Sequence, residues 1–357
     1  MIGPSIGIWC SVGEATAPAA LTAGQWSVAD KGTDGAITIT VSALPSDGGS
    51  AITALQYRID GGSWVSMAGT GTGARDVTGL SNSVQITVDL RAVNVVGNAT
   101  ASDGKNVIPR LAEINTYRAA CTVAPTLGRE VILSALVAGL KSDSLWTKLD
   151  WLLILAAEDE QAGRVNLRAP SKVASRVNSM TFTTDLGFTG NASNMHLDLG
   201  EVPNAAGNGF DRDTCHLGLW VNGGSTTATR SAGQASSSSL FMTTRGSNGT
   251  VTCSLQDSTN EAYFNRSGVS SSSGCYIATR TASSVKTGSF NGVAGTPLTT
   301  ASNTSPLAAN LTIGRSSSVY DDKRYAAFTS GSGLSNADMT ALYNRLSTAL
   351  TAIGANV

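Results

Sequence analysis

The chain has 357 residues, of which only 14% are charged, and its formal net charge is −1. This weak charge excludes the strong positive field that attracts nucleic acids and anionic membranes. The hydrophobic share of 41% is enough to build folded cores, which excludes a wholly disordered chain. No apolar stretch approaches the roughly 20 residues of a membrane span. We therefore expect two or three domains, with neither membrane insertion nor nucleic-acid binding.

Residues 1–17 predict an irregular leader ahead of the first folded domain. Gly and Pro interrupt its apolar residues, and it lacks the basic segment of a signal peptide, so we expect no export by the general secretory route. Trp9 is a large apolar side chain next to Cys10, and neither has a local core in which to lie. We interpret Trp9 and Cys10 as an assembly anchor that docks into another protein, with a disordered tail as the alternative.

Residues 18–109 have the pattern of a β domain. Short runs alternate between apolar and polar residues with a period of two, most clearly at 36–41, 54–59 and 84–94. The sequence Asp60-Gly61-Gly62 predicts a tight hairpin turn between two of these strands.

Residues 110–170 have a different pattern, with apolar residues recurring at intervals of three and four. This periodicity predicts a helical hairpin whose two segments are separated by residues 141–144, after a short first helix near 112–120. We expect its apolar stripe to pack against a neighbouring domain or another copy. The stripe consists of Leu133, Leu136, Val137, Leu140, Leu149, Leu152 and Leu153.

Residues 171–357 return to short β runs separated by turns rich in Gly, Ser and Asn. The runs at 216–221 and 311–314 are the clearest. The last element is predicted to be a helix, because Ser335 and Asp338 have the spacing of an N-cap residue and its third-position acid.

The segment 18–109 resembles a fibronectin type III domain. The residues that carry the resemblance are Pro18, Trp26, the turn at 60–62, Leu80 and the run 88–97, which reads Val-Asp-Leu-Arg-Ala-Val-Asn-Val-Val-Gly. The resemblance implies a seven-stranded sandwich with Trp26 in its core. Ile86 stands near the position where the family has a core tyrosine.

The rest of the chain resembles the laminin-G or concanavalin A-like jelly-roll modules of bacteriophage and gene-transfer-agent structural proteins. Four segments in this order carry the resemblance: 145–152, 180–190, 311–315 and 325–335. It implies a mainly β fold in which two antiparallel sandwiches are joined by a helical hairpin and followed by a C-terminal helix. The expected domains are an anchoring arm (1–17), a fibronectin type III-like domain (18–109), a helical connector (110–170) and a jelly roll (171–357).

Together the two resemblances imply a protein of the virion surface, made in the cytoplasm of a host bacterium. The expected function is that of a tail fibre, spike or adhesin that presents a lectin-like domain for attachment to host glycans. The expected partners are other virion structural proteins, two further copies in a homotrimer, and a host cell-surface glycan. The alternative is a capsid or tail decoration protein that stabilises the particle and binds no receptor.

A sugar-binding surface needs exposed aromatic rings flanked by amides and hydroxyls. Tyr263, Phe264, Tyr276 and Tyr320 are the candidates, because they lie near Ser- and Asn-rich loops, whereas Trp220 stands in an apolar strand and is predicted to be core.

Calcium is the one cofactor that the sequence suggests. The carboxylates of Asp321 and Asp322 could supply oxygen ligands to Ca²⁺, although they fall short of a complete ligand set. No pair among the five cysteines has CxxC spacing, so neither a zinc knuckle nor a thioredoxin motif is expected, and we interpret them as buried thiols.

The sequence does not predict an enzyme. The only two histidines, His196 and His216, lie in strand patterns without a partner for acid–base catalysis. The acids Glu158, Asp159 and Glu160 are consecutive on a predicted helix, so they do not converge on one point as the two acids of a glycosidase must. A secreted glycan-degrading enzyme is therefore disfavoured.

Overall fold

A computed structural model describes most of the chain, which divides into two compact units, Met1–Ala112 and Glu113–Val357. The described residues are 13–225, 230–234, 240–244, 251–257, 273–303 and 307–356, together with the backbone of 263–264. Among these residues, no helix is both long and apolar enough to cross a membrane.

The first unit is an antiparallel sandwich of a three-stranded and a four-stranded sheet. One sheet has the order β1 (Trp26–Asp30), β2 (Ile37–Val41), β5 (Gly73–Val77), and the other has the order β4 (Val65–Ser66), β3 (Ala54–Ile59), β6 (Ile86–Val93), β7 (Lys105–Val107). Alternate residues of β6 are buried, as the period of two predicts. Trp26 is only 2% exposed and lies in the core. The predicted seven-stranded, fibronectin type III-like sandwich is confirmed.

One buried amide fastens the start of this unit to its loops. The Asn94 side chain is 4% exposed. Its Nδ2 donates to the carbonyl oxygens of Thr16 (2.7 Å) and Asp47 (2.8 Å). Its Oδ1 accepts from the backbone N–H groups of Val96 (2.9 Å) and Gly97 (3.0 Å). A single side chain therefore connects the segment after the leader with the loops that follow β2 and β6.

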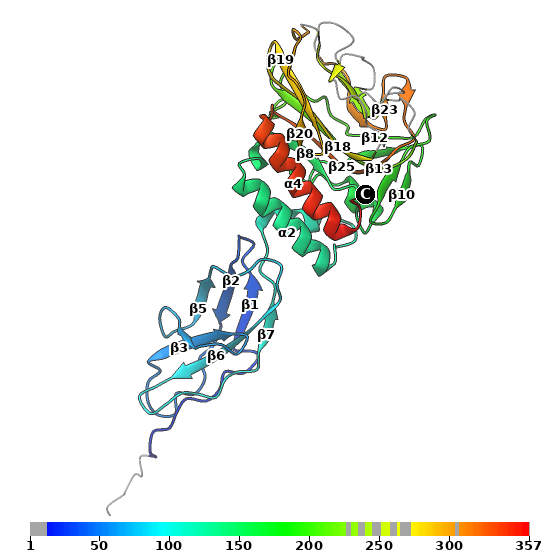
Figure 1. The fold of residues 1–357 in the computed structure, drawn as a ribbon. Coiled ribbons are helices and arrows are strands. Elements are labelled where there is room, and N and C mark those ends of the chain that lie inside the picture. The colour runs from blue at the N-terminus through cyan, green and yellow to red at the C-terminus, as the bar shows by residue number, and fades with distance from the viewer. Residues whose placement is uncertain are drawn as a thin grey trace, which may run out of the picture. The chain divides into compact units, whose positions relative to one another are not determined.

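The second unit is a larger sandwich, made mainly of a nine-stranded and a seven-stranded antiparallel sheet (Figure 1). The nine-stranded sheet has the order β10 (Thr181–Thr183), β11 (Gly187–Thr189), β25 (Arg324–Gly331), β13 (Cys215–Gly223), β18 (Gly274–Ala282), β19 (Val285–Phe290), β20 (Val293–Ala294), with β8 (Leu149–Leu153) on β25 and β21 (Leu298–Thr299) on β19. The seven-stranded sheet has the order β17 (Tyr263–Phe264), β16 (Val251–Leu255), β15 (Leu240–Thr243), β14 (Ala232–Gln234), β22 (Leu311–Ile313), β12 (His196–Asp198), β9 (Ser175–Val177). Apolar side chains from both sheets, such as Leu219, Phe328 and Ile313, form one core. The predicted second sandwich is confirmed.

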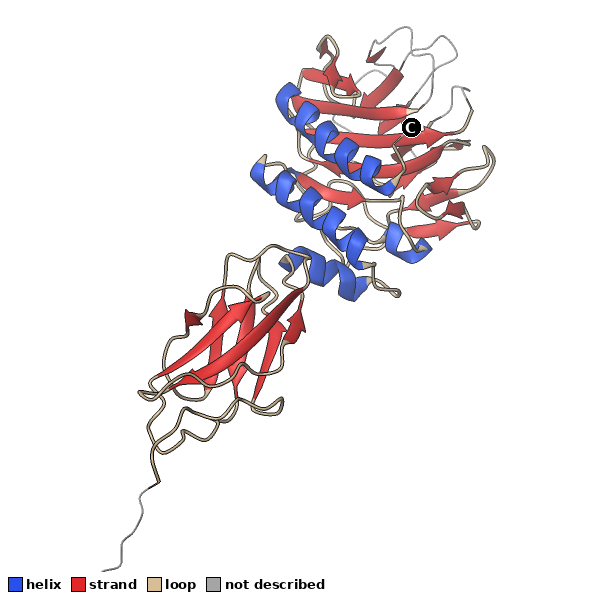
Figure 2. Cartoon of the chain, turned by 60° about the horizontal axis from the view of Figure 1, so that its bottom comes forward, coloured by secondary structure: helices blue, strands red, loops and turns tan. Residues whose placement is uncertain are grey.

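Helices cover the outer face of the nine-stranded sheet. The helices on this face are α2 (Leu127–Ser142) and α4 (Asn336–Ile353), and the other helical elements are α1 (Ala112–Ala120), a 3₁₀ turn (Trp146–Lys148) and α3 (Glu160–Arg164). Figures 1 and 2 both show α2 and α4 side by side. The Tyr343 ring of α4 stacks on Trp220 of β13, with centroids 5.6 Å apart and planes 4° apart. The predicted capping box of α4 is present at Ser335 and Asp338.

The prediction of a helical hairpin over 110–170 is correct in its first part and wrong in its second. Helices α1 and α2 form as expected, and Leu133, Leu136, Val137 and Leu140 are buried. Residues 149–153 instead form β8, which pairs with β25. The core of the sandwich covers one face of this strand and the helices cover the other, so apart from Asp150 its residues are apolar and buried without alternation. This region is therefore not a separate connector, because β8 belongs to the sandwich itself.

A buried ionic cluster joins the two sheets at one end of β16. Arg280 and Lys286 lie directly opposite each other on β18 and β19. Two like charges so placed repel each other. Asp257, just after β16, pairs with both: its Oδ1 binds Arg280, and its Oδ2 lies 2.7 Å from the Lys286 Nζ. Arg280 also donates to the Leu255 carbonyl oxygen (2.9 Å), and Lys286 to that of Cys253 (3.2 Å). The three charged side chains are at most 1% exposed.

We predict that Asp257→Asn strongly destabilises the protein, because it leaves two cations buried without a counter-charge. Removing one partner of a buried pair costs about 3–5 kcal/mol. The measurement is urea unfolding of the full chain at neutral pH. The control is Asp76→Asn, which breaks the exposed pair with Lys31 and should change the unfolding midpoint little. An equal effect of the two substitutions would contradict the role of Asp257.

Candidate carbohydrate-binding surface

Tyr320 lies on a small hairpin beside the seven-stranded sheet. The hairpin consists of β23 (Arg315–Ser316) and β24 (Val319–Tyr320), in which Arg315 and Tyr320 pair directly across the strands. The Arg315 guanidinium lies 5.3 Å from the centroid of the Tyr320 ring, a cation–π contact. The His196 ring lies 5.8 Å from the same centroid. Tyr320 is half-buried, so part of its ring is held by these neighbours and part faces solvent.

A loop with exposed amides borders this ring. The Oδ1 of Asn191 accepts from three successive backbone N–H groups, those of residues 193, 194 and 195, at 3.0–3.1 Å. Ala192 donates its backbone N–H to the Asp321 carbonyl oxygen (3.1 Å), which places the loop beside Tyr320. Asn178 donates to the Asn194 carbonyl oxygen (2.9 Å). Asn178, Asn191 and Asn194 are all exposed.

Arg315 links the ring to the histidine. Its Nε donates to the Ser317 carbonyl oxygen (2.7 Å), and its Nη1 lies 3.4 Å from the His196 Nε2. Burial, and then the nearby Arg315 charge, lower the pKa of His196, which favours the neutral ring. A neutral imidazole can accept a hydrogen bond from the guanidinium. The arrangement therefore fixes the Arg315 side chain against both rings.

Asp321 does not form the predicted calcium site. Its side chain is fully buried, with Oδ1 2.8 Å from the Lys323 Nζ and Oδ2 accepting from the hydroxyls of Tyr325 (2.6 Å) and Ser231 (2.5 Å). Burial, and then the Asp321 charge, raise the pKa of Tyr325 well above its usual value, so this hydroxyl stays protonated. Asp322 accepts from Ser225 (2.8 Å) instead of joining Asp321 at a common point. The described residues contain no group of three or more His, Cys, Asp or Glu side chains suited to a metal ion.

The other aromatic candidates have different outcomes. Tyr276 is fully buried and packs on Phe290 with ring centroids 4.8 Å apart, so its prediction as a sugar contact is wrong. Its position in a strand covered on both faces explains the error. Trp220 is core, as predicted. The side chains of Tyr263 and Phe264, and the predicted anchor Trp9–Cys10, lie outside the described part of the chain.

Sequence reasoning missed Arg315 and the contact of His196 with Tyr320. A signal for Arg315 was present, because Arg315 and Tyr320 flank four short residues, Ser-Ser-Ser-Val, which suit a hairpin turn. No sequence signal connects His196 with this hairpin, since 119 positions separate it from Arg315.

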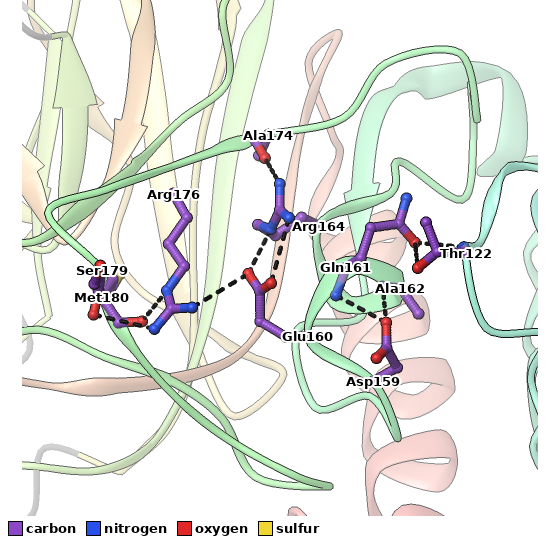
Figure 3. A network of polar contacts seen from close by, with 10 residues as sticks. All are labelled: Thr122, Asp159, Glu160, Gln161, Ala162, Arg164, Ala174, Arg176, Ser179 and Met180. Atoms are coloured by element: carbon purple, nitrogen blue, oxygen red, sulfur yellow. Dashed lines mark hydrogen bonds and ion pairs between the residues drawn. The ribbon is translucent and has the colours of Figure 1, made fainter.

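The acids at 158–160 have separate structural roles. Glu158 accepts from the N–H and hydroxyl of Thr126, at 2.9 and 2.6 Å. Asp159 caps α3 through the N–H groups of residues 161 and 162 (Figure 3). Glu160 pairs with Arg164 at 2.6 Å. The three side chains therefore do not form a pair of converging acids.

An apolar cavity of about 190 Å³ lies beneath the loop between α1 and α2. Val123 of that loop lines it, and Glu158 and Asp159 border it.

His216, the second histidine of the sequence, is a core residue rather than a site residue. It is fully buried, and its Nδ1 lies 2.6 Å from the Ser332 carbonyl oxygen, to which it donates. Its Nε2 is buried without a hydrogen-bond partner among the described residues. Burial lowers the pKa of His216 from 6.5 to about 4.

Comparison with known proteins gives structural likeness only. Neither a protein-family model nor a curated protein matches the chain. A solution structure of the sixth fibronectin type III domain of human fibronectin type III domain containing protein 3 is 20% identical, with a TM-score of 0.23, over 28% of this chain and 92% of that one. Titin domains A168–A170 are 18% identical, with a TM-score of 0.22, over 27% of this chain and 33% of that one. The binding domain of botulinum neurotoxin serotype D is 13% identical, with a TM-score of 0.40, over 57% of this chain and 52% of that one.

These likenesses carry no argument about function, because every TM-score is below 0.5. The chain spans about a third of the titin structure and about half of the neurotoxin domain. The evidence for the fibronectin type III-like sandwich and for the larger sandwich is therefore the order of the strands and the burial of their apolar side chains.

We predict that stability falls between about pH 6.5 and pH 4 because of His216. The unfolded chain takes up a proton near pH 6.5, whereas the folded chain resists protonation until about pH 4. The free energy of unfolding should fall by about 3 kcal/mol in total, because the pKa drops from 6.5 to about 4 and each pKa unit corresponds to about 1.36 kcal/mol. His216→Asn keeps a donor for the Ser332 carbonyl oxygen and removes the titration. Urea unfolding at pH 7 and pH 5 should show a smaller pH effect for this variant than for wild type, and equal effects would contradict the prediction.

Proposed function

We propose that the chain is a structural protein on the surface of a bacteriophage-like particle, and that its second unit binds host-cell glycans through the surface around Tyr320. The observation that carries the proposal is the half-buried Tyr320 ring, fixed by Arg315 and His196 and bordered by exposed amides. An apolar ring face suits the C–H face of a pyranose, and amides suit its hydroxyls. Because the ring is already held in place, binding costs little side-chain entropy.

The composition supports an outward-facing role. Charged residues make up only 14% of the chain, so its surface is polar through hydroxyls and amides rather than through charge. Such a surface does not attract particular charged partners over a long range. Recognition then depends on short-range contacts, such as ring stacking and hydrogen bonds, which are the contacts that glycans offer. The fibronectin type III-like unit would present the larger sandwich away from the particle.

The second candidate function is a decoration protein that stabilises a capsid or tail and binds no receptor. Exposed apolar residues on the helices, such as Val131 at 43% exposure, favour it, because they suit contacts within a particle. Both functions agree with the homotrimer that we propose. They differ in whether the isolated protein binds the host cell surface.

We predict that Tyr320→Ala weakens the binding of purified protein to host cells and to arrayed bacterial surface polysaccharides by about tenfold. An aromatic contact contributes about 1 kcal/mol or more, and 1.4 kcal/mol is a factor of ten in affinity. The matched control is Val319→Ala, on the same hairpin and 37% exposed, which should bind as wild type does. Equal binding by the two variants, with both folded by circular dichroism, would refute the Tyr320 site. No binding by wild type to either probe would favour the decoration function.

A further inference from the structure

An apolar groove runs between α2 and α4. It has a volume of about 230 Å³ and is lined by Val131, Ile132, Ala135, Leu136, Arg345, Thr348, Ala349 and Ala352. Four of these, Val131, Ala135, Thr348 and Ala352, are exposed. Small side chains at two of the exposed positions allow another chain to approach the helices closely. None of the lining residues carries a carboxylate.

One lining residue is charged, and its position defines an end of the groove. The Arg345 guanidinium crosses α2 at Gly139, where an added Cβ would lie only 2.7 Å from it. It pairs with Asp143 at 2.7 and 3.0 Å, just after α2. The groove is therefore apolar along its length, with a neutralised guanidinium plane at one end.

The leader has the composition that such a groove would bind. No charged residue precedes Glu14, so the first 13 residues are uncharged. Ile6, Ile8, Cys10 and Val12 occur at every second position, so an extended chain would place them on one face. Trp9 would lie on the other face of the extended chain.

The lengths also agree. The α4 residues that line the groove span positions 345 to 352, which is about 10 Å of helix at 1.5 Å per residue. Three or four residues of extended chain cover that distance at about 3.3 Å each. The segment from Ile8 to Cys10 and one neighbour is long enough to fill the groove.

We propose that the leader of one copy occupies the α2–α4 groove of a second copy. This contact goes beyond glycan binding, because it would join copies of the chain to one another. It is head-to-tail: one copy contributes the leader and the next contributes the groove. A head-to-tail contact generates a closed ring if the rotation closes, and an open filament if it does not. Burial of the leader's apolar side chains would supply the affinity.

The cavity beneath the α1–α2 loop provides a matched control surface. It is also apolar and has an exposed residue at its rim, Val123, at 59% exposure. The carboxylates of Glu158 and Asp159 border it, so it differs from the groove in charge. The proposal requires the leader to reach Ala135 and not Val123.

Disulfide trapping with the native Cys10 tests the contact. The variant is Ala135→Cys in a Cys121→Ser background, since Cys121 is partly accessible whereas Cys215, Cys253 and Cys275 are buried. Mild oxidation of the full chain should give reducible, covalent dimers and larger species on a denaturing gel. Val123→Cys in the same background should give few of them, and adding Cys10→Ser to the Ala135→Cys variant should abolish them. A disulfide formed only within one copy, or trapping no stronger than at Val123, would overturn the proposal.

A second measurement requires no cysteine chemistry. Ala135→Glu places a charge in the groove at an exposed helical position, so the fold should persist. Light scattering should show a smaller mass for this variant than for wild type at the same concentration. Val123→Glu should leave the mass unchanged. Equal masses for wild type and Ala135→Glu, with both folded by circular dichroism, would overturn the proposal whatever the result for glycan binding.

Discussion

The second unit depends on carboxylates shared between its two sheets. Asp257 extends from the end of β16 to cations on β18 and β19, and Asp321 connects Ser231, next to β14, with Tyr325 on β25. Strands β15 and β16 pair in antiparallel register, and the two aspartates act at opposite ends of that pair. Buried charges of this kind add little net stability, but each is costly to leave unpaired. The two carboxylates therefore contribute little to the free energy of unfolding, and their main effect is to restrict how the two sheets can be aligned.

The Tyr320 surface is a consequence of this restriction. Asp321 follows Tyr320 directly, and its side chain is fixed in the interior by Lys323 and Tyr325. Gly190 allows the neighbouring loop to approach, since an added Cβ there would lie 2.0 Å from the Asp321 carbonyl oxygen. The ring and its bordering amides are thus held by contacts that continue into the core. A surface fixed in this way is preorganised, which reduces the entropy lost when a ligand binds.

The sequence predicted most of the architecture, and its errors have physical causes. Alternation at period two located β2, β3 and β6 of the first unit, and in β2 and β6 every second residue is buried. The same rule failed at 149–153, where a strand buried on both faces looks like a buried helix. Asp321 resembled a calcium ligand because its partners could not be seen. Asp321, Lys323 and Tyr325 occur at every second position, and in an extended chain this spacing predicts that all three side chains lie on one face.

The Asn94 contacts determine how the first unit would bear a mechanical load. Thr16 and Ala19 donate their backbone N–H groups to Gly48 and Ser46 (2.8 and 2.9 Å), and Asn94 binds the Thr16 carbonyl oxygen. A tension applied through the leader would therefore enter at these bonds. It would be shared between the loop after β2 and the end of β6 before it reached any strand of the core. A protein pulled by its leader would thus load the hydrogen bonds of these loops before those of its sheets.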